Sequence, residues 1–320
     1  MTEAQRNAQA RILAATLTLL AREEDSLPSP FALWRVPLTA QDIKEAALKV
    51  ASGQARVVWV DDGYPARGLL IRQEQALESL ILGYRAFRLL GPWLMEPDPG
   101  ERQKKTATLA RKAQDLEPGP GFWAVKAIHD PAIIRGFLRA GFQVAEISSR
   151  LSGPINPQLP PEFPFSRGEG LSLRTPERGE GPAWLERLGD LFYDGHYLHG
   201  PFLPRDFSTK LWRAVSLSHF AQAQPALFLW EELAQRPVAV ALANVQGQEA
   251  SLSVLFVAEE LRGKGWGRTL LLETLRELGR LKATSLTVET AAYNLPALAL
   301  YQGVGLKTRA PLITLHGMKS

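Results

Sequence analysis

The chain has 320 residues, of which 45% are hydrophobic and 22% charged, an ordinary composition for a globular protein longer than one average domain. It contains no cysteine, which excludes disulfides, Cys-ligated metal sites and a Cys nucleophile. The formal net charge of +4 is spread along the chain and forms no basic stripe. Such a distribution suits an anionic small ligand and argues against nucleic-acid binding.

The N-terminal segment and the histidines give no sign of a membrane or metal protein. Residues 1–25 lack a signal-peptide cleavage pattern and have the spacing of an amphipathic helix. The longest apolar run is far too short to span a membrane. The five histidines are scattered and form no H-x-x-x-H pair. We therefore expect a cytoplasmic protein with no metal and no membrane partner.

A proline-rich stretch divides the chain. Residues 152–170 contain five prolines and no amphipathic repeat, which is typical of a semi-rigid linker. The sequence therefore predicts a first domain over residues 1–151, a linker over residues 152–170 and a second domain over residues 171–320.

The second domain has a clear succession of elements. Helical spacing at residues 181–192 and 204–220 precedes three strand-like runs at 226–232, 237–245 and 250–258. A glycine-rich stretch then opens a helix at 269–281. A strand at 284–291, a short helix at 294–305 and a strand at 307–318 follow. This order predicts an α/β (α+β) domain with a mixed, mostly antiparallel sheet and helices on both faces.

The end of the first domain repeats the end of the second. Residues 121–153 have the pattern strand, helix, Gly-Phe, strand, with the same internal spacing as residues 285–308. The aligned pairs are Asp130 with Asn294, Phe137 with Tyr301, Gly141 with Gly305 and Phe142 with Leu306. Matching order and spacing near the end of each half favour an internal repeat.

The glycine-rich stretch has the chemistry of a phosphate site. A helix N-terminus exposes N–H groups without intrahelical partners and carries about half a positive charge. Glycines there allow the backbone to approach an anion closely, and neighbouring cations add full charges. It matches neither the P-loop nor the dinucleotide fingerprint. The residues expected to bind a phosphate or diphosphate are Arg262, Gly263, Lys264, Gly265, Trp266, Gly267, Arg268 and Thr269.

Two motifs carry a resemblance to a known family. Arg262, Gly265 and Gly267 form R-x-x-G-x-G, and the segment from Asn294 to Leu306 reads N-x-x-A-x-x-x-Y-x-x-x-G-L. Residues 171–320 therefore resemble the GNAT superfamily of acyl-CoA-dependent N-acyltransferases. The first half resembles a degenerate copy, so the resemblance implies a tandem GNAT fold. Within the superfamily the chain is loosely similar to dTDP-fucosamine acetyltransferase and its relatives.

The resemblance implies roles for particular residues. In this family the fourth and fifth strands splay apart, acetyl-CoA binds in the gap as co-substrate, and a tyrosine protonates its sulfur. Tyr301 would be that acid, and Asn294 would cap its helix and reach the cofactor. Glu289 is the candidate base, with a water chain as the alternative. His196 and His199, in a segment that often lines the acceptor pocket in this family, would contact the acceptor or serve as the base. Leu255, Phe256 and Val257 would lie along the pantetheine arm.

The first half lacks both the R-x-x-G-x-G motif and the tyrosine, since Phe137 has no hydroxyl. We therefore expect that only the second half binds acetyl-CoA. The expected reaction is direct transfer of an acetyl group to a primary amine of a small molecule, with an amino sugar as one candidate, by a monomer or homodimer. A non-catalytic acyl-CoA-sensing module and a protein N-terminal or lysine acetyltransferase remain the alternatives.

Overall fold

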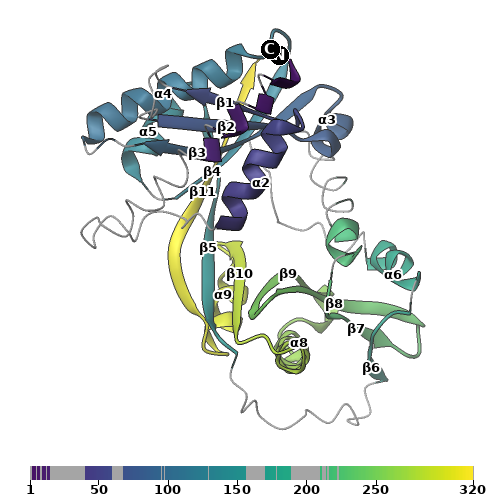
Figure 1. Ribbon diagram of the computed structural model, residues 1–320. Coiled ribbons are helices and arrows are strands. Elements are labelled where there is room, and N and C mark those ends of the chain that lie inside the picture. The colour runs from purple at the N-terminus through teal and green to yellow at the C-terminus, as the bar shows by residue number, and fades with distance from the viewer. Residues whose placement is uncertain are drawn as a thin grey trace. The chain divides into compact units, whose positions relative to one another are not determined.

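The computed structural model describes parts of residues 2–14 and then residues 40–59, 68–94, 96, 98–128, 130–155, 170–177, 179–188, 210, 214, 216–221 and 223–319 (Figure 1). The chain forms two compact units. Unit 1 comprises Met1–Ile147, Leu198–Leu203 and Ala310–Ser320, and unit 2 comprises Ser148–Tyr197 and Pro204–Arg309.

Unit 1 places a mixed sheet against helices. Its described strands are ordered β1-β2-β3-β4-β11, with β3 and β4 pairing in parallel. Phe87, Trp123 and Phe137 are fully buried in the core that α4, α5 and the sheet share. The elements are α2 (Ala40–Ala51), β1 (Ala55–Trp59), β2 (Gly68–Glu74), α3 (Ala76–Leu82), β3 (Arg85–Leu94), α4 (Pro99–Asp115), β4 (Gly121–Ile128), α5 (Pro131–Arg139), the start of β5 (Gln143–Pro154) and most of β11 (Lys307–Lys319).

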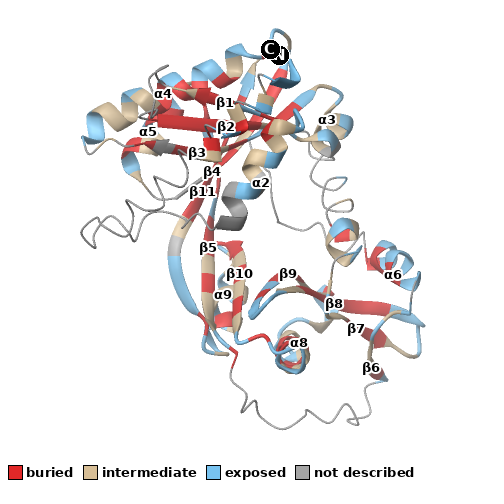
Figure 2. Cartoon of the chain, in the orientation of Figure 1, coloured by how far each residue is buried: buried red, intermediate tan, exposed pale blue. Residues whose placement is uncertain are grey.

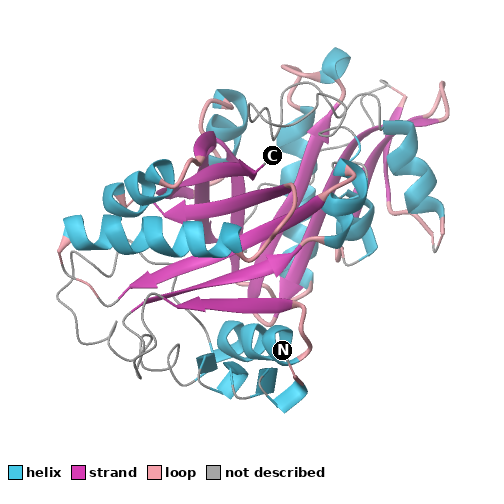
Figure 3. Cartoon of the chain, turned by 90° about the horizontal axis from the view of Figure 1, so that it is seen from above, coloured by secondary structure: helices cyan, strands magenta, loops and turns pink. Residues whose placement is uncertain are grey.

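The strands of unit 2 are ordered β5-β10-β9-β8-β7-β6, and β9 and β10 pair in parallel. Residues 237–243 of its strand β8 are buried without interruption (Figure 2). Helices flank the strands (Figure 3). The elements are β6 (Leu171–Arg174), α6 (Glu180–Leu188), β7 (Ala226–Glu231), β8 (Arg236–Gln246), β9 (Glu249–Val257), the 3₁₀ turn η3 (Glu259–Leu261), α8 (Trp266–Arg280), β10 (Ser285–Ala291) and α9 (Leu295–Gln302).

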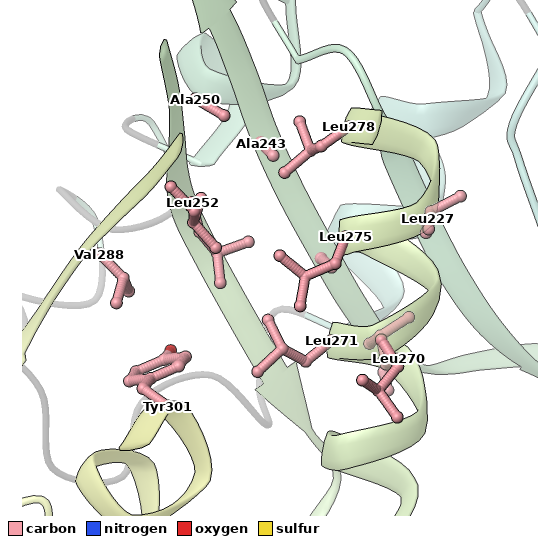
Figure 4. Close-up of a cluster of buried hydrophobic side chains, with 14 of the residues drawn as sticks. Leu227, Ala243, Ala250, Leu252, Leu270, Leu271, Leu275, Leu278, Val288 and Tyr301 are labelled. Carbon is pink, nitrogen blue, oxygen red and sulfur yellow. The ribbon is translucent and has the colours of Figure 1, made fainter. Parts of the chain in front are cut away.

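Leucines on one face of α8 hold this helix against the sheet of unit 2. Leu271, Leu275 and Leu278 point toward Ala243 and Leu252 on β8 and β9 (Figure 4). Their spacing of three and four residues forms the apolar stripe that an amphipathic helix presents to a core. Burying each leucine stabilises the unit by about 1.5–3 kcal/mol. The packing therefore fixes where the N-terminus of α8 lies relative to the end of β9.

The predicted fold class is confirmed, because each unit is a mixed sheet with flanking helices, and the order from β7 to β11 is the predicted one. The short strand β6 was not predicted, since it contains only two apolar residues, Leu171 and Leu173. Most of the predicted linker lies outside the described residues, and the domain boundary stays a prediction. Each unit also contains a segment from the other half of the sequence. Residues 148–154 of β5 belong to unit 2, and β11 from residue 310 belongs to unit 1.

The aligned segments of the two halves have matching local structure. Asp130 caps α5 and Asn294 caps α9, each with its side-chain oxygen accepting from backbone N–H groups. Gly141 and Gly305 follow these helices with φ of 87° and 93°, a conformation that favours glycine. Phe137 and Tyr301 are both buried. The repeat inferred from spacing therefore corresponds to equivalent caps, turns and core positions.

A buried histidine in unit 1 leads to a prediction about acid stability. His316 on β11 is fully buried with its ring edge-on to Phe122, and within the described part of the chain neither ring nitrogen has a hydrogen-bond partner. Burial disfavours the imidazolium and lowers the pKa of His316 from 6.5 to about 4. The unfolded chain therefore binds this proton more readily than the folded chain, and stability falls as the pH drops from 6.5 toward 4.

At 1.36 kcal/mol per pKa unit, His316 should cost about 3 kcal/mol of unfolding free energy between pH 7 and pH 4. Denaturant titrations of the native protein and of His316→Leu across this range would measure it. Any packing change in the variant does not depend on pH, so the difference in pH dependence isolates the imidazole. Parallel stability curves for the two proteins would refute the assignment.

Candidate functional site

Strands β9 and β10 separate partway along their length. Their parallel register runs from Ser285 opposite Glu249 to Val288 opposite Leu252 and ends there, although β9 continues to Val257 and β10 to Ala291 (Figure 1). The register of β9 with β8 shifts at the same point, with Ser253 as the extra residue. A β-bulge bends its strand and increases the local twist. The bulge thus turns the end of β9 away from β10.

The edge of β9 that faces this opening carries backbone groups available for a ligand. Ala258 donates its N–H to Val238 on the β8 side. Successive residues of a strand direct their N–H and C=O groups to opposite sides, so Leu255 and Val257 direct theirs toward the opening. Of these groups, the carbonyl oxygen of Val257 already accepts from Arg262 Nε. Among the described residues, no strand pairs with this side of β9 beyond Leu252. An extended chain with amide groups could pair there as an added strand.

The turn that follows β9 ends with an uncapped helix N-terminus. Gly263 and Gly265 have φ of 74° and 88°, and helix α8 begins directly after Gly265. The first helical bond runs from Thr269 N to Gly265 O, so the N–H groups of Gly267 and Arg268 have no partner within the helix. In the described structure no side chain caps this end. A Cβ at Gly263 or Gly265 would meet no described atom within 4 Å.

The start of α8 lies against the two other elements of the site. A Cβ placed on Gly267 would be 3.6 Å from Val257 Cγ2 at the end of β9 and 3.7 Å from Leu300 Cδ2 on α9. The open space over the glycines, the free backbone donors and the helix dipole are what a diphosphate requires. These residues therefore fit the diphosphate of a nucleotide-like ligand.

The three cations of the turn are exposed, but they are not equivalent. Arg262 donates from Nε to the carbonyl oxygen of Val257 at 3.0 Å, and its guanidinium lies 5.9 Å from the ring centroid of Phe256. Arg268 donates from Nη1 to Gly303 O at 3.3 Å and so joins the start of α8 to the end of α9. Lys264 extends from the exposed turn itself. Two of the three thus also stabilise the turn.

Two predicted ligand contacts of this turn lie on its inner side. Thr269 is buried, and its hydroxyl donates to Gly265 O at 3.4 Å. Trp266 is half-buried and packs against the core of unit 2. Their observed contacts support the turn, and their predicted contact with a ligand stays a prediction.

Tyr301 lies at the opening between the strands. In Figure 4 its ring lies below Val288 of β10 and faces Leu271 of α8. The residue is 5% exposed and belongs to the core of unit 2. Burial raises the pKa of its hydroxyl above the ordinary 10, so the phenol stays protonated at neutral pH. It is therefore available to donate a hydrogen bond or a proton at neutral pH.

Asn294 serves the helix on which Tyr301 is carried. Its side-chain oxygen accepts from Ala297 N at 3.3 Å, and its amide group donates to Thr290 Oγ1 at 3.2 Å. The predicted cap is confirmed. These bonds tie α9 to the end of β10, and capping interactions of this kind are worth about 1 kcal/mol. A direct contact from Asn294 to a ligand stays a prediction.

Glu289 is the first residue of β10 beyond the paired region, and it points to the face opposite Val288 because side chains alternate. Its carboxylate accepts from Ser148 Oγ at 2.7 Å, and Arg150 Nη2 lies 3.9 Å away. Both partners are on β5, which the first half of the sequence provides. Sequence analysis missed them, because only the pairing of β5 with β10 brings them to this place.

The remaining predicted site residues are not placed. His196 and His199 lie outside the described residues. Among the residues that the structure does describe, no group of His, Asp and Glu side chains could hold a metal ion. In the same set, no helix is long and apolar enough to cross a membrane.

The equivalent place in the first half is built differently. Strands β3 and β4 also pair in parallel and stop pairing at Leu89 and Val125, and β3 also has an irregular register with its other neighbour. Helix α4, however, begins with a carboxylate cap: Asp98 accepts from Glu101 N at 2.7 Å, and Glu101 lies in the first turn. Glu96 is close by and pairs with Lys105. Carboxylate side chains therefore occupy the N-terminus of α4, which is the end of a helix that can bind an anion.

Comparison with known families agrees with this geometry. Residues 189–306 match the model of the acetyltransferase (GNAT) family, a span that includes the glycine turn, both diverging strands and Tyr301. The chain contains a GNAT acetyltransferase domain. Enzymes of this family transfer an acyl group from acetyl-CoA to an amine, and the protein is accordingly an acyl-CoA-dependent N-acetyltransferase. No curated protein matches the chain.

Solved structures extend the similarity to both halves. A GCN5-related N-acetyltransferase from Sphaerobacter thermophilus has 16% identity and a TM-score of 0.62 over 99% of this chain and 94% of its own. A tandem GNAT protein from the clavulanic acid biosynthesis pathway has 14% identity and a TM-score of 0.60 over 96% and 94%. The glucosamine N-acetyltransferase region of a fungal β-N-acetylglucosaminidase has 15% identity and a TM-score of 0.58 over 89% and 36%. Similarity at this level shows a tandem GNAT fold.

Proposed function

We propose that the enzyme acetylates a primary amine of a small molecule by direct attack of the amine on acetyl-CoA, with a single catalytic centre in unit 2. The observation that supports this most strongly is the convergence of three features. The opening between β9 and β10, the uncapped start of α8 and the protonated Tyr301 lie together in one unit. A non-catalytic sensor would need the first two features only.

Each group in this proposal has one task. The N–H groups opening α8, with Lys264 and Arg262, hold the diphosphate, and the edge of β9 at Leu255 and Val257 holds the pantetheine amides. One of these β9 N–H groups stabilises the negative charge that develops on the thioester oxygen. Phe256 and the half-buried Trp266 provide apolar surface beside the arm.

The reaction forms a C–N bond, breaks the C–S bond, moves a proton from nitrogen to a base and supplies one to sulfur. The hydroxyl of Tyr301 is the proposed donor to sulfur. Glu289 is the proposed acceptor of the amine proton, directly or through water, and Ser148 positions its carboxylate. An alkylamine has a pKa near 10.4, so a neutral nucleophile at pH 7 requires such a base.

An amino sugar is the acceptor that we favour among small amines. One structural neighbour is named for glucosamine, but its 15% identity carries only the fold. The polar side chains of Ser148, Arg150 and Glu289 beside the opening suit a hydroxylated acceptor better than an apolar one. Acetylation of protein N-termini or lysines is the second candidate, which an amine panel can test directly.

The proposal predicts one acetyl-CoA site per chain. Calorimetric titration should give a stoichiometry of one, because the carboxylates at the start of α4 repel an anion that the start of α8 attracts. Thiol release in the presence of an amine panel should then identify acceptors. Two equivalent sites would contradict the asymmetry between the halves, and acetyl-CoA binding without turnover on any amine or peptide would favour a sensing module.

A further inference from the structure

A polar face of unit 2 lies beside the opening, on the side of the sheet opposite α9. Strands β5 and β10 pair with Glu289 opposite Arg150 and Thr287 opposite Ser152, and opposite residues in a pair share one face. The residues between them, Leu151 and Val288, are buried in the core on the other face. One face of the β5–β10 ribbon is therefore apolar and closed, and the other carries charged and hydroxyl groups.

Two arginine side chains lie on this face of the described structure. Arg309, near the start of β11, donates from Nε to Ser152 Oγ at 2.8 Å, which places its guanidinium on the same face as Arg150. The bond uses Nε and leaves the Nη groups for another acceptor. Arg150 is 38% exposed and lies 3.9 Å from Glu289, too far for a hydrogen bond. Two guanidinium groups thus lie on the same face as the Glu289 carboxylate, which accepts a hydrogen bond from Ser148 Oγ.

The two arginines lie within reach of one small ligand. Arg150 and Ser152 are two residues apart on β5, a separation of about 6.6–6.8 Å along a strand. Glu289 stands opposite Arg150 at the point where β9 and β10 diverge. A ligand whose amine lies at Glu289 could place a group about 6–7 Å further along the strand beside Arg309. Guanidinium groups prefer carboxylates and phosphates, which they bind in a bidentate manner.

We propose that the acceptor is an anionic amine, whose nitrogen lies beside Glu289 and whose carboxylate or phosphate is bound by Arg150 and Arg309. The inference rests on the proposed function, since it assigns a substrate class to the same site. It explains why a carboxylate beside the opening has a neighbouring cation that it does not bond tightly. It also gives the first half of the chain a part in the site, because β5 provides Ser148, Arg150 and Ser152.

The test compares amines that differ by one anionic group: glucosamine with glucosamine 6-phosphate, and propylamine with β-alanine. Calorimetry on the CoA-saturated enzyme should show the anionic member of at least one pair binding about tenfold tighter, as a charge-assisted bidentate contact implies. A preference within the glucosamine pair indicates a phosphate site, and a preference within the propylamine pair indicates a carboxylate site. Equal affinities within both pairs, or no binding of any member, would overturn the inference.

Arginine substitutions test which side chain causes the preference for the anionic amine. Arg309→Gln should reduce the preference for the anionic member to about threefold or less, since one of the two guanidinium groups is lost. The matched control is Arg280→Gln, which removes an exposed arginine paired with Glu277 at the far end of α8 and should leave the preference unchanged. An unchanged preference in Arg309→Gln would refute the anion site. Repeating the amine titrations without CoA shows whether the anion preference depends on bound CoA. A failure of acetyl-CoA itself to bind would refute the proposed function, and it is thereby distinguished from loss of the anion site.

Discussion

Gly265→Val should lower the affinity for acetyl-CoA about a hundredfold or more. Gly265 has a φ of 88° and ends the turn directly before α8, so the orientation of the first N–H groups depends on it. Valine is strongly disfavoured in this conformation, and its branched side chain would fill the open space above the backbone. Each charge-assisted hydrogen bond lost costs about 1.5–3 kcal/mol, and the turn offers several. Calorimetric titration with acetyl-CoA measures the change.

A matched variant separates loss of the site from backbone strain. Gly141 has a φ of 87°, follows helix α5 in unit 1 and, like Gly265, would place a Cβ within 4 Å of no described atom. Gly141→Val should therefore cost a similar amount of stability, about 1–2 kcal/mol, and leave acetyl-CoA binding intact. If the two variants bind acetyl-CoA equally well, the glycine turn is not the diphosphate site.

The sequence predicted what depends on local chemistry. Leucines at helical spacing predicted α8, Asn294 was predicted to cap α9, and glycines after a strand predicted a turn that opens a helix. Each of these features depends on residues a few positions apart. The spacing of Asp130, Phe137 and Gly141 likewise sufficed to find their counterparts in the second half.

Long-range pairing is what the sequence did not reveal. Nothing local in β5 shows that residues 148–154 belong with β10 in unit 2, because a strand with polar residues on one face could pair with several partners. The same pairing brings Ser148 and Arg150 to Glu289. The bulge at Ser253, which separates β9 from β10, also has no local sequence signal, since it depends on the register with β8.

Tyr301→Phe should reduce turnover by about 10²–10⁴-fold and leave acetyl-CoA affinity nearly unchanged. The variant removes one hydroxyl from a buried ring and preserves the packing against Val288 and Leu271. Phe137 already occupies the equivalent buried position in the first half, so phenylalanine is compatible with this place in the fold. Steady-state rates with an amine acceptor, together with calorimetry, measure the two quantities separately. Similar rates for both proteins, with chemistry as the slow step, would remove Tyr301 from the mechanism.

The pH dependence of turnover tests the role of Tyr301 independently. Burial raises the pKa of Tyr301 above its ordinary value of 10, so the neutral phenol persists through the range in which the acceptor amine loses its proton. Turnover should therefore rise with pH and show no fall below about pH 10 from ionisation of this tyrosine.

The raised pKa of Tyr301 also affects the transfer of its proton to sulfur. Because this phenol is a weaker acid than usual, complete transfer of its proton to the thiolate is unfavourable in free energy. Its hydroxyl must then stabilise the charge on sulfur by a hydrogen bond as the C–S bond breaks, and the proton transfers late in that process. A buried donor of this kind is effective because the low dielectric strengthens the bond, which is the condition that α8, α9 and β10 create around Tyr301.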